Sequence, residues 1–271
     1  MIELLVATDL DGTLLDERTY GFDPARPALA ALERSGAFLV LASSKTRAEM
    51  EPLGRQLGLR PALIVENGGA VLVPDGGDGY ETFVCGVERA SLVAALDEIG
   101  REVGVALQGF ASFTAERVTD LTGLPGDAAA RALLRDYDEP FLVEDESRAP
   151  AVAAAARRRG LRVRRGGRFF HLTGDADKGS ALRLLCARLE ATGRTFRSVG
   201  LGDAGNDLPL LRAVDRPIVI PRAGGRPDPA LAAAFAGAEL APAPGPAGWN
   251  LAILAVLAGD RLPLVGGARG V

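Results

Sequence analysis

Residues 3–13 read ELLVATDLDGT, an apolar run that ends at two aspartates separated by one leucine. The run Glu3–Thr8 has the length and composition of a buried strand. Asp9 and Asp11 follow it directly, and Gly12 lets the backbone turn there. Active sites of open α/β sheets lie at the carboxyl ends of the strands, so we expect both carboxylates at such a site. An Asx turn after a strand would give the same local pattern, so other motifs must decide between the two.

The two ends of the chain share a strand–helix rhythm that favours one parallel sheet covered by helices. Short apolar runs are followed by helical patterns that stop at a glycine or a loop. We therefore predict that both ends form halves of a single α/β domain. The expected strands are residues 3–8, 38–42, 62–65, 70–73, 196–201 and 217–220, and the expected helices are residues 25–35, 46–57, 178–192, 206–213 and 248–258.

The middle of the chain mixes strand and helix patterns without this rhythm, after a turn-rich stretch that reads PDGGDG at residues 74–79. We predict a core domain made of residues 1–80 and 171–271, and an inserted α+β domain made of residues 81–170. The expected helices of the insertion are residues 87–103, 114–122, 127–137 and 148–159, and its expected strands are residues 105–108, 141–144, 161–165 and 169–173.

Composition argues against a nucleic-acid-binding or membrane protein. The 271 residues carry a formal net charge of −4, so no basic excess indicates a nucleic-acid partner. The first residues lack the pattern of a secretory leader, and the apolar run Leu251–Ala258 is too short to span a bilayer. Cys85 and Cys186 are too few for a disulfide framework and lie in apolar stretches. We expect a soluble cytoplasmic protein.

A second acidic motif, GLGDAGND at residues 200–207, also follows an apolar run and begins a helical pattern. Asp203 and Asp207 are one helical turn apart, with Asn206 between them. Oxygen ligands of this kind suit Mg²⁺, which prefers octahedral coordination and keeps several waters. An acidic first helical turn would explain the same residues. The metal interpretation gains weight because two acidic motifs follow strands of the same predicted sheet.

Two segments supply candidate phosphate ligands. The sequence SSKT at residues 43–46 begins a helix, and a hydroxyl beside free N–H groups can cradle phosphate there. An ordinary N-cap would fit this segment equally well. Lys178 begins the helix that resumes the core domain and can offer a compact positive charge to a phosphoryl oxygen. Lys45 and Lys178 are the only lysines among 31 basic residues, and both precede helices of the predicted site, so chance placement is the poorer explanation.

In this order, DLDGT, the Ser43 loop, Lys178 and GDAGND resemble the four motifs of the haloacid dehalogenase superfamily, and the insertion resembles its C2-type cap in Cof-like members. The stretches SSKTRAEM, ENGGAV, TGLPGDAAARALLRDYDEPF and GGRFFHLTGDADKG are similar to the mannosyl-3-phosphoglycerate phosphatase family. This likeness covers essentially the whole chain. It implies a Rossmann-like parallel-sheet core with an α+β cap, and hydrolysis of a phosphorylated glycosyl-glycerate to mannosylglycerate, a compatible solute.

The resemblance also implies roles for the motif residues. Asp9 would attack phosphorus and form an aspartyl phosphate. Asp11 would protonate the leaving oxygen and then activate the hydrolytic water. Ser43 and Lys178 would hold the phosphoryl oxygens, and Asn206 would orient the surroundings of Lys178.

The same likeness implies a Mg²⁺ ion at the carboxyl edge of the sheet. Its ligands would be the Asp9 carboxylate, the Asp11 backbone carbonyl, Asp203 and, through water, Asp207. The cation would reduce the repulsion between the attacking carboxylate and the phosphate.

The cap is expected to exclude water and to recognise the sugar and the carboxylate of the substrate. The candidate substrate-binding residues are Arg168, Gln108 and Thr114 in the cap, and Ser44 and Lys45 in the core. Arg168 could pair bidentately with the carboxylate, although solvated positions or local hydrogen bonds would also explain the cap residues. His171 is expected to make a structural hydrogen bond, with a substrate contact as the alternative.

Three other functions remain open at this point. A phosphohexomutase would return the phosphoryl group to a sugar, and a broader sugar-phosphate phosphatase would use the same core residues. A binding module that kept only the fold is the third alternative, although all the motif carboxylates are present. The sequence does not distinguish mannosyl from glucosyl substrates and leaves the oligomeric state unknown.

Overall fold

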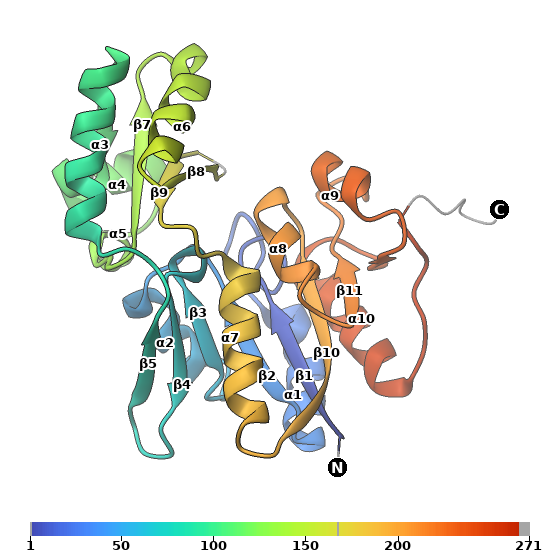
Figure 1. The fold of residues 1–271 in the computed structure, drawn as a ribbon. Coiled ribbons are helices and arrows are strands. Elements are labelled where there is room, and N and C mark those ends of the chain that lie inside the picture. The colour runs from blue at the N-terminus through green and yellow to red at the C-terminus, as the bar shows by residue number, and fades with distance from the viewer. Residues whose placement is uncertain (1, 167, 266–271) are drawn as a thin grey trace.

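The computed structural model describes residues 2–166 and 168–265 and places them around two separate sheets (Figure 1). The larger sheet has eight strands, with the N-terminal strand in its interior. The strands from β12 to β3 are parallel, and β4 and β5 continue the sheet in antiparallel pairing. In spatial order they are β12 (Glu239–Leu240), β11 (Arg216–Val219), β10 (Thr195–Gly202), β1 (Ile2–Thr8), β2 (Phe38–Ala42), β3 (Ala62–Val65), β4 (Ala70–Pro74) and β5 (Tyr80–Val84).

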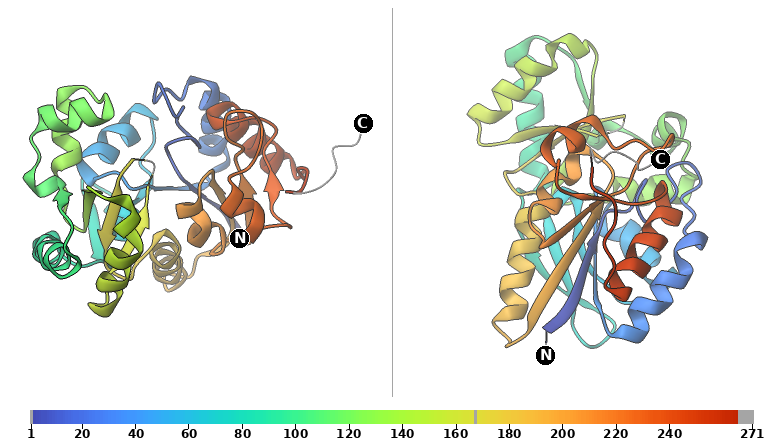
Figure 2. Two further views of the ribbon diagram at one scale, coloured as in Figure 1. Left: turned by 90° about the horizontal axis from the view of Figure 1, so that it is seen from above. Right: turned by 90° about the vertical axis from the view of Figure 1, so that its right-hand side faces the viewer.

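Helices cover both faces of the large sheet because its interior strands are apolar on both sides. Figure 2 shows α7 (Lys178–Glu190) on one side, and α1 (Arg26–Ser35) and α10 (Gly245–Ala258) on the other. Alternate residues of β1 supply the two cores: Leu5 packs with α7, and Val6 packs with α1 and α10. The core domain also contains the helices α2 (Arg47–Gln56), α8 (Leu208–Leu211) and α9 (Pro229–Ala234).

The smaller sheet has four antiparallel strands and stands over the β3–β5 end of the large sheet (Figure 1). Its order is β6 (Leu107–Gly109), β7 (Asp138–Val143), β9 (Phe170–Thr173) and β8 (Arg162–Arg165). Helices α3 (Arg89–Val103) and α6 (Ala149–Arg158) share one apolar core with this sheet. Two shorter helices, α4 (Ala115–Thr122) and α5 (Gly126–Leu133), build a second cluster around Phe110. We call residues 85–173 the cap and the rest the core.

Two strands lie across the predicted boundaries between the core and the insertion. β5 was placed in the insertion from residue 81, yet it pairs with β4 in the large sheet. β9 was split at residue 171, yet the whole strand pairs with β7 in the small sheet. The division into a core and a cap domain itself stays a prediction.

Some predicted elements differ in length from the observed ones. The helix predicted for residues 127–137 ends at Leu133, because the backbone of residues 135–138 turns to meet the core. The helix predicted for residues 206–213 is a single 3-10 turn, Gly205–Asp207, followed by the four-residue α8. The sequence pattern did not predict β5, α9 or β12. Further 3-10 turns lie at Asp23–Ala25, Glu66–Gly68, Phe110–Ser112 and Glu146–Arg148.

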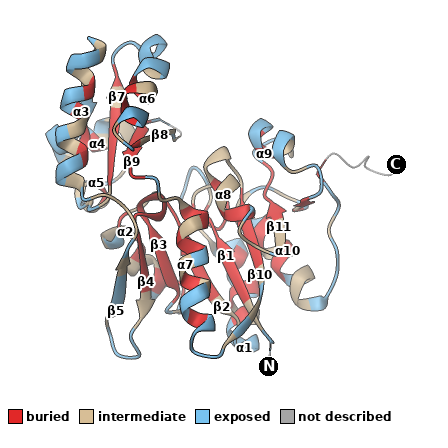
Figure 3. Ribbon diagram, viewed as in Figure 1, coloured by how far each residue is buried: buried red, intermediate tan, exposed pale blue. Residues whose placement is uncertain are grey.

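Burial is concentrated in the strands of the large sheet and in the inner faces of its helices (Figure 3). Trp249 is fully buried and donates its indole N–H to Thr8 Oγ1 at 3.0 Å, directly behind Asp9. Cys85 and Cys186 are free and partly buried. Within the described ranges, no helix has the length and apolar character needed to cross a membrane.

Candidate active site

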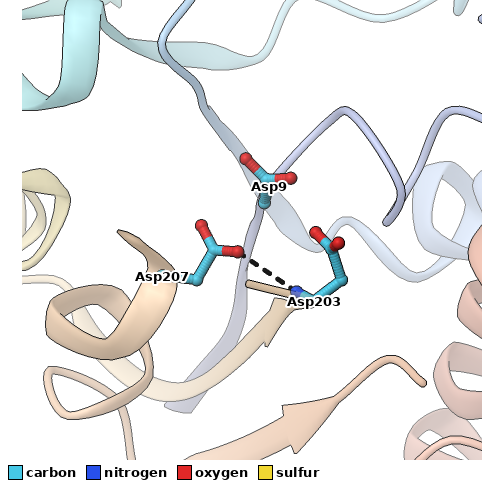
Figure 4. A group of neighbouring side chains, drawn as sticks. All are labelled: Asp9, Asp203 and Asp207. Atoms are coloured by element: carbon cyan, nitrogen blue, oxygen red, sulfur yellow. Dashed lines mark hydrogen bonds between the residues drawn. The ribbon is translucent and has the colours of Figure 1, made fainter. Parts of the chain in front are cut away.

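Three aspartates from separate motifs converge at the carboxyl edge of the large sheet (Figure 4). Asp9 directly follows β1 and is buried, and its backbone N–H donates to Leu201 O of the neighbouring strand β10 at 2.9 Å. Asp203 directly follows β10, and Asp207 precedes α8. One carboxylate oxygen from each of the three lies within 4.8 Å of the others. The carboxylates of Asp9, Asp203 and Asp207 therefore lie close enough together to share one metal ion.

Lys178 lies beneath this cluster and joins two of its members. Its Nζ contacts Asp9 Oδ1 at 2.5 Å and Asp207 Oδ1 at 2.6 Å, and the side chain is almost fully buried. Burial opposes the ammonium charge, but Asp207 and Asp9 outweigh it and raise the pKa of Lys178. Asp177 fixes the start of α7 through a capping box with Ser180. The lysine is therefore a permanent cation held by the two motif aspartates.

The cluster carries more negative charge than Lys178 can balance. Burial, with the nearby Asp207 charge as the next cause, raises the pKa of Asp9 well above its usual range. Burial and the same neighbour raise the pKa of Asp203 to about 7. A cation placed between buried carboxylates stabilises their ionised form. The arrangement fits a divalent cation.

The hydrogen bonds of the cluster indicate which aspartates could be direct ligands. Both oxygens of Asp207 are engaged, Oδ1 by Lys178 and Oδ2 by the backbone N–H groups of Asp203 and Ala204 at 3.1 Å. Asp203 accepts from the Thr13 hydroxyl through Oδ1 only. Among the described residues, Asp9 and Asp203 thus each keep an oxygen without a hydrogen-bond partner and line the same cavity, whereas both oxygens of Asp207 are used to hold Lys178 and the loop.

Gly12 is required by the close approach of Asp203. Its φ is +82°, and a Cβ at this position would lie 2.7 Å from Asp203 Oδ2. A side chain here would therefore displace the carboxylate as well as strain the backbone. The glycine of the first motif makes room for the aspartate of the last one.

Asp11 lies outside the three-aspartate cluster but lines the same cavity as Asp9 and Asp203. Its Oδ2 forms an ion pair with Lys45 Nζ at 3.0 Å, and Tyr20 covers the lysine at 4.9 Å from the ring centroid. The Oδ1 atom is buried and has no hydrogen-bond partner among the described residues. A carboxyl oxygen with a free lone pair beside Asp9 can exchange a proton with a bound substrate or water.

The Ser43 loop lies beside Asp9 and is fixed by the next strand. Ser43 is buried, and its backbone N–H donates to Ile64 O at 2.9 Å. Thr46 caps α2 through a capping box with Glu49. The loop is therefore a rigid edge of the site rather than a free turn.

Two adjoining cavities open between core and cap. The first, of about 540 Å³, is lined by the predicted residues Asp9, Asp11, Ser43, Ser44, Asp203 and Asn206, and by Arg164, Arg165 and His171 from the cap. The second, of about 810 Å³, contains Lys45 and Arg168 together with Arg135 and Phe169. Asp11, Ser44, Arg165 and His171 line both, so the two cavities are continuous.

The structure does not bring Gln108 and Thr114 to either cavity. Gln108 is exposed on β6, and Thr114 uses its hydroxyl to cap α4 by accepting from Arg117 N. His171 is buried, and its Nδ1 lies 2.8 Å from Asp138 Oδ2. Arg135, which we did not predict, reaches the cavity from the loop after α5. Because we predicted a helix over residues 127–137, Arg135 was expected within that helix, and no local sequence signal indicated that it lies in a loop at the cavity.

Comparisons with known proteins agree with this geometry. The sequence model of haloacid dehalogenase-like hydrolases matches residues 6–97. A glucosyl-3-phosphoglycerate/mannosyl-3-phosphoglycerate phosphatase from Persephonella marina is 37% identical over 265 residues, which cover 94% of this chain and 97% of the relative. The chain belongs to this phosphatase family. A relative with the same name from Methanococcoides burtonii is 37% identical over 262 residues, covering 92% of this chain and 96% of the relative.

Solved structures share the fold, and one of them is described as an enzyme of the haloacid dehalogenase superfamily. A subclass IIB sugar phosphatase has a TM-score of 0.66 at 17% identity and covers 94% of this chain and 98% of its own. A protein from Streptococcus mutans has a TM-score of 0.68 at 16% identity, covering 94% and 99%. The predicted fold class, a parallel-sheet core with a separate α+β cap, is confirmed.

Proposed function

We propose that this phosphatase hydrolyses mannosyl-3-phosphoglycerate or glucosyl-3-phosphoglycerate to the glycosylglycerate and inorganic phosphate. The observation that carries the proposal is the convergence of Asp9 and Asp203 beneath a cavity whose cap wall carries several arginines. A substrate with both a phosphate and a carboxylate needs such cations at two places. The names of the two relatives give the substrate class.

In the proposed reaction the two first-motif aspartates have separate roles. An Asp9 oxygen attacks phosphorus, and the bond between phosphorus and the glycerate oxygen breaks. Asp11 gives a proton to that oxygen, so the glycosylglycerate leaves as an alcohol. Asp11 then takes a proton from water as the water oxygen attacks the aspartyl phosphate, which releases phosphate and restores the Asp9 carboxylate.

We propose Mg²⁺ as the divalent cation. Asp9, Asp203 and the backbone carbonyl of Asp11 would hold it, with Asp207 contributing through water. When bound, the ion would offset the repulsion between the Asp9 carboxylate and the substrate phosphate. Ser43, Lys178 and Asn206 would position the phosphoryl oxygens.

Recognition of the rest of the substrate falls to the larger cavity. Arg168 is proposed to bind the carboxylate, with Ser44 and Lys45 on the core side of the same cavity. The cytoplasmic location expected from the sequence stays a prediction.

The deciding experiment compares phosphate release from mannosyl-3-phosphoglycerate, glucosyl-3-phosphoglycerate and simple hexose phosphates. We expect the two glycosyl-3-phosphoglycerates to have the higher kcat/KM, and Asp9→Asn to lower turnover by at least about 10⁴-fold. A preference for hexose phosphates would favour the broader phosphatase, and formation of a sugar-phosphate isomer would favour the mutase. Chelation should abolish activity, and Mg²⁺ should restore it and also raise the melting temperature of Asp9→Asn less than that of the wild type.

A further inference from the structure

Two consecutive residues outside the four motifs connect the phosphate-binding loop with the cap. Glu66 and Asn67 follow β3 and are both buried, and neither takes part in the chemistry proposed above. Their φ angles are +50° and +59°, a left-handed conformation that is uncommon for residues other than glycine. Backbone of this kind persists only where the surroundings determine it, and it clusters at functional sites.

The backbone of these residues holds the phosphate-binding loop. Glu66 N–H donates to Lys45 O at 3.0 Å, and Asn67 N–H donates to Ser43 O at 2.9 Å. Both carbonyls belong to the loop that carries the predicted phosphate ligand. The left-handed turn is what points two successive N–H groups at that loop.

The side chains of the same residues hold the cap. The Glu66 carboxylate accepts the backbone N–H groups of Asp136 and Tyr137, at 2.8 Å for the latter. Asn67 Nδ2 donates to Asp138 Oδ2 at 3.1 Å. All three partner residues belong to the segment 136–138, so one short piece of the cap receives every one of these hydrogen bonds.

Asp138 links the Asn67 side chain to two residues of the cavity wall. Its Oδ2 also contacts Arg135 Nη1 at 3.2 Å and His171 Nδ1 at 2.8 Å, and the carboxylate is fully buried. Arg135 Nη1 in turn donates to Ser44 O at 3.1 Å. Arg135 and His171 line the larger cavity, so the position of Asp138 sets the position of two side chains that face the substrate.

From these contacts we infer that Glu66 and Asn67 are positioning residues, which fix the substrate-facing wall of the cap in register with the phosphate-binding loop. The inference rests on the proposed function for its choice of substrate. It places part of the specificity of the enzyme in the hydrogen bonds from these two residues to the segment 136–138, although Asn67 also lines the smaller cavity. A phosphoester too small to reach the cap should depend less on these bonds than a glycosyl-3-phosphoglycerate does.

The test uses Asn67→Asp, which keeps a residue that tolerates positive φ but sets a carboxylate against Asp138. Loss of a hydrogen bond to a buried charge should lower kcat/KM for glycosyl-3-phosphoglycerate by about 10- to 100-fold. Hydrolysis of p-nitrophenyl phosphate should fall by a smaller factor, because this ester does not use the cap wall; some fall is expected, since Asn67 also lines the smaller cavity. The reversed pair, Asn67→Asp with Asp138→Asn, should recover part of the loss.

The matched control is Ser112→Ala, which removes a hydrogen bond of 2.7 Å to Gly109 O inside the cap and leaves the connection to the core intact. It should affect neither substrate. An equal fall for both substrates in Asn67→Asp, or no fall for either, would overturn the inference.

Amide hydrogen exchange separates this inference from the proposed function. In Asn67→Asp the amides of residues 135–138 should exchange at least about tenfold faster than in the wild type, and in Ser112→Ala they should not. This result is expected even if glycosyl-3-phosphoglycerates prove not to be substrates. Unchanged exchange in both variants would refute the connection whatever the enzyme hydrolyses.

Discussion

The core and the cap contribute to the site in different ways. In the core, Asp9, Ser43 and Asp203 each follow directly after a parallel strand, so the sheet itself brings them together. In the cap, Arg135 and Arg168 lie in loops and reach the cavity only through the way the cap sits on the core. Chemistry is therefore fixed by strand order, whereas selection of the substrate depends on contacts between distant segments. Substitutions in the core should therefore affect the chemical step, and substitutions in the cap should affect the choice of substrate.

The largest effect is expected in the core, at Lys178. Lys178→Met removes the ammonium that pairs with two buried carboxylates, Asp9 and Asp207. Because breaking one partner leaves buried charge uncompensated, the free energy of unfolding should fall by about 3–5 kcal/mol. Urea denaturation without divalent cations measures the change. Turnover should also fall by at least about 10³-fold.

A surface ion pair in the cap gives the matching control. Arg158 pairs with Glu102 between α6 and α3, and its side chain is 60% exposed. Arg158→Met should cost less than about 1 kcal/mol, because solvent screens such pairs. If the two variants lost equal amounts of unfolding free energy, the buried aspartate cluster would depend on the Lys178 ammonium no more than the exposed ion pair depends on Arg158.

The same contrast explains what the sequence could predict. The motif residues were predicted correctly as neighbours because a parallel sheet aligns the carboxyl ends of its strands, whatever lies between them in the chain. Gln108 and Thr114 lie outside the two cavities described above, and nothing in a local pattern says which side of β6 or which end of α4 faces the core. Arg135 was missed for the same reason: a tertiary bond to Ser44, not helical periodicity, determines where its side chain lies.

Glu66, which joins the two regions, should make stability depend on pH. Burial outweighs the lowering effect of Arg135 and raises the pKa of Glu66 to about 7 from an ordinary value of 4.5. A carboxyl whose pKa is higher in the folded state stabilises the fold when protonated. That contribution is fully present below about pH 4.5 and is lost as the pH rises through 7.

The variant Glu66→Gln keeps an acceptor oxygen and removes the titration. Between pH 4.5 and 7.5, the free energy of unfolding of the wild type should fall by about 3 kcal/mol more than that of Glu66→Gln. Urea denaturation at several pH values gives this difference, in which the other titrating groups cancel. Parallel curves would show that Glu66 ionises as freely in the fold as in water, and the contact between core and cap would lose its pH dependence.

The smallest effect is expected for Arg168, in the cap wall, because a single ligand contact is at stake. If Arg168 binds the carboxylate, Arg168→Ala should raise KM for glycosyl-3-phosphoglycerate about tenfold and leave KM for hexose phosphates nearly unchanged. Arg168→Lys should recover only part of the loss, since an ammonium lacks the planar fork that binds both oxygens.

Arg165 provides a control for the Arg168 variant. It lines the same cavity, but Glu146 pairs with it at 3.0 Å and Phe170 packs against its guanidinium, so part of its charge is already compensated. Arg165→Ala should therefore raise KM for the carboxylated substrate less than Arg168→Ala does. The reverse order would indicate that the carboxylate is bound at the end of β8 rather than in the loop before β9.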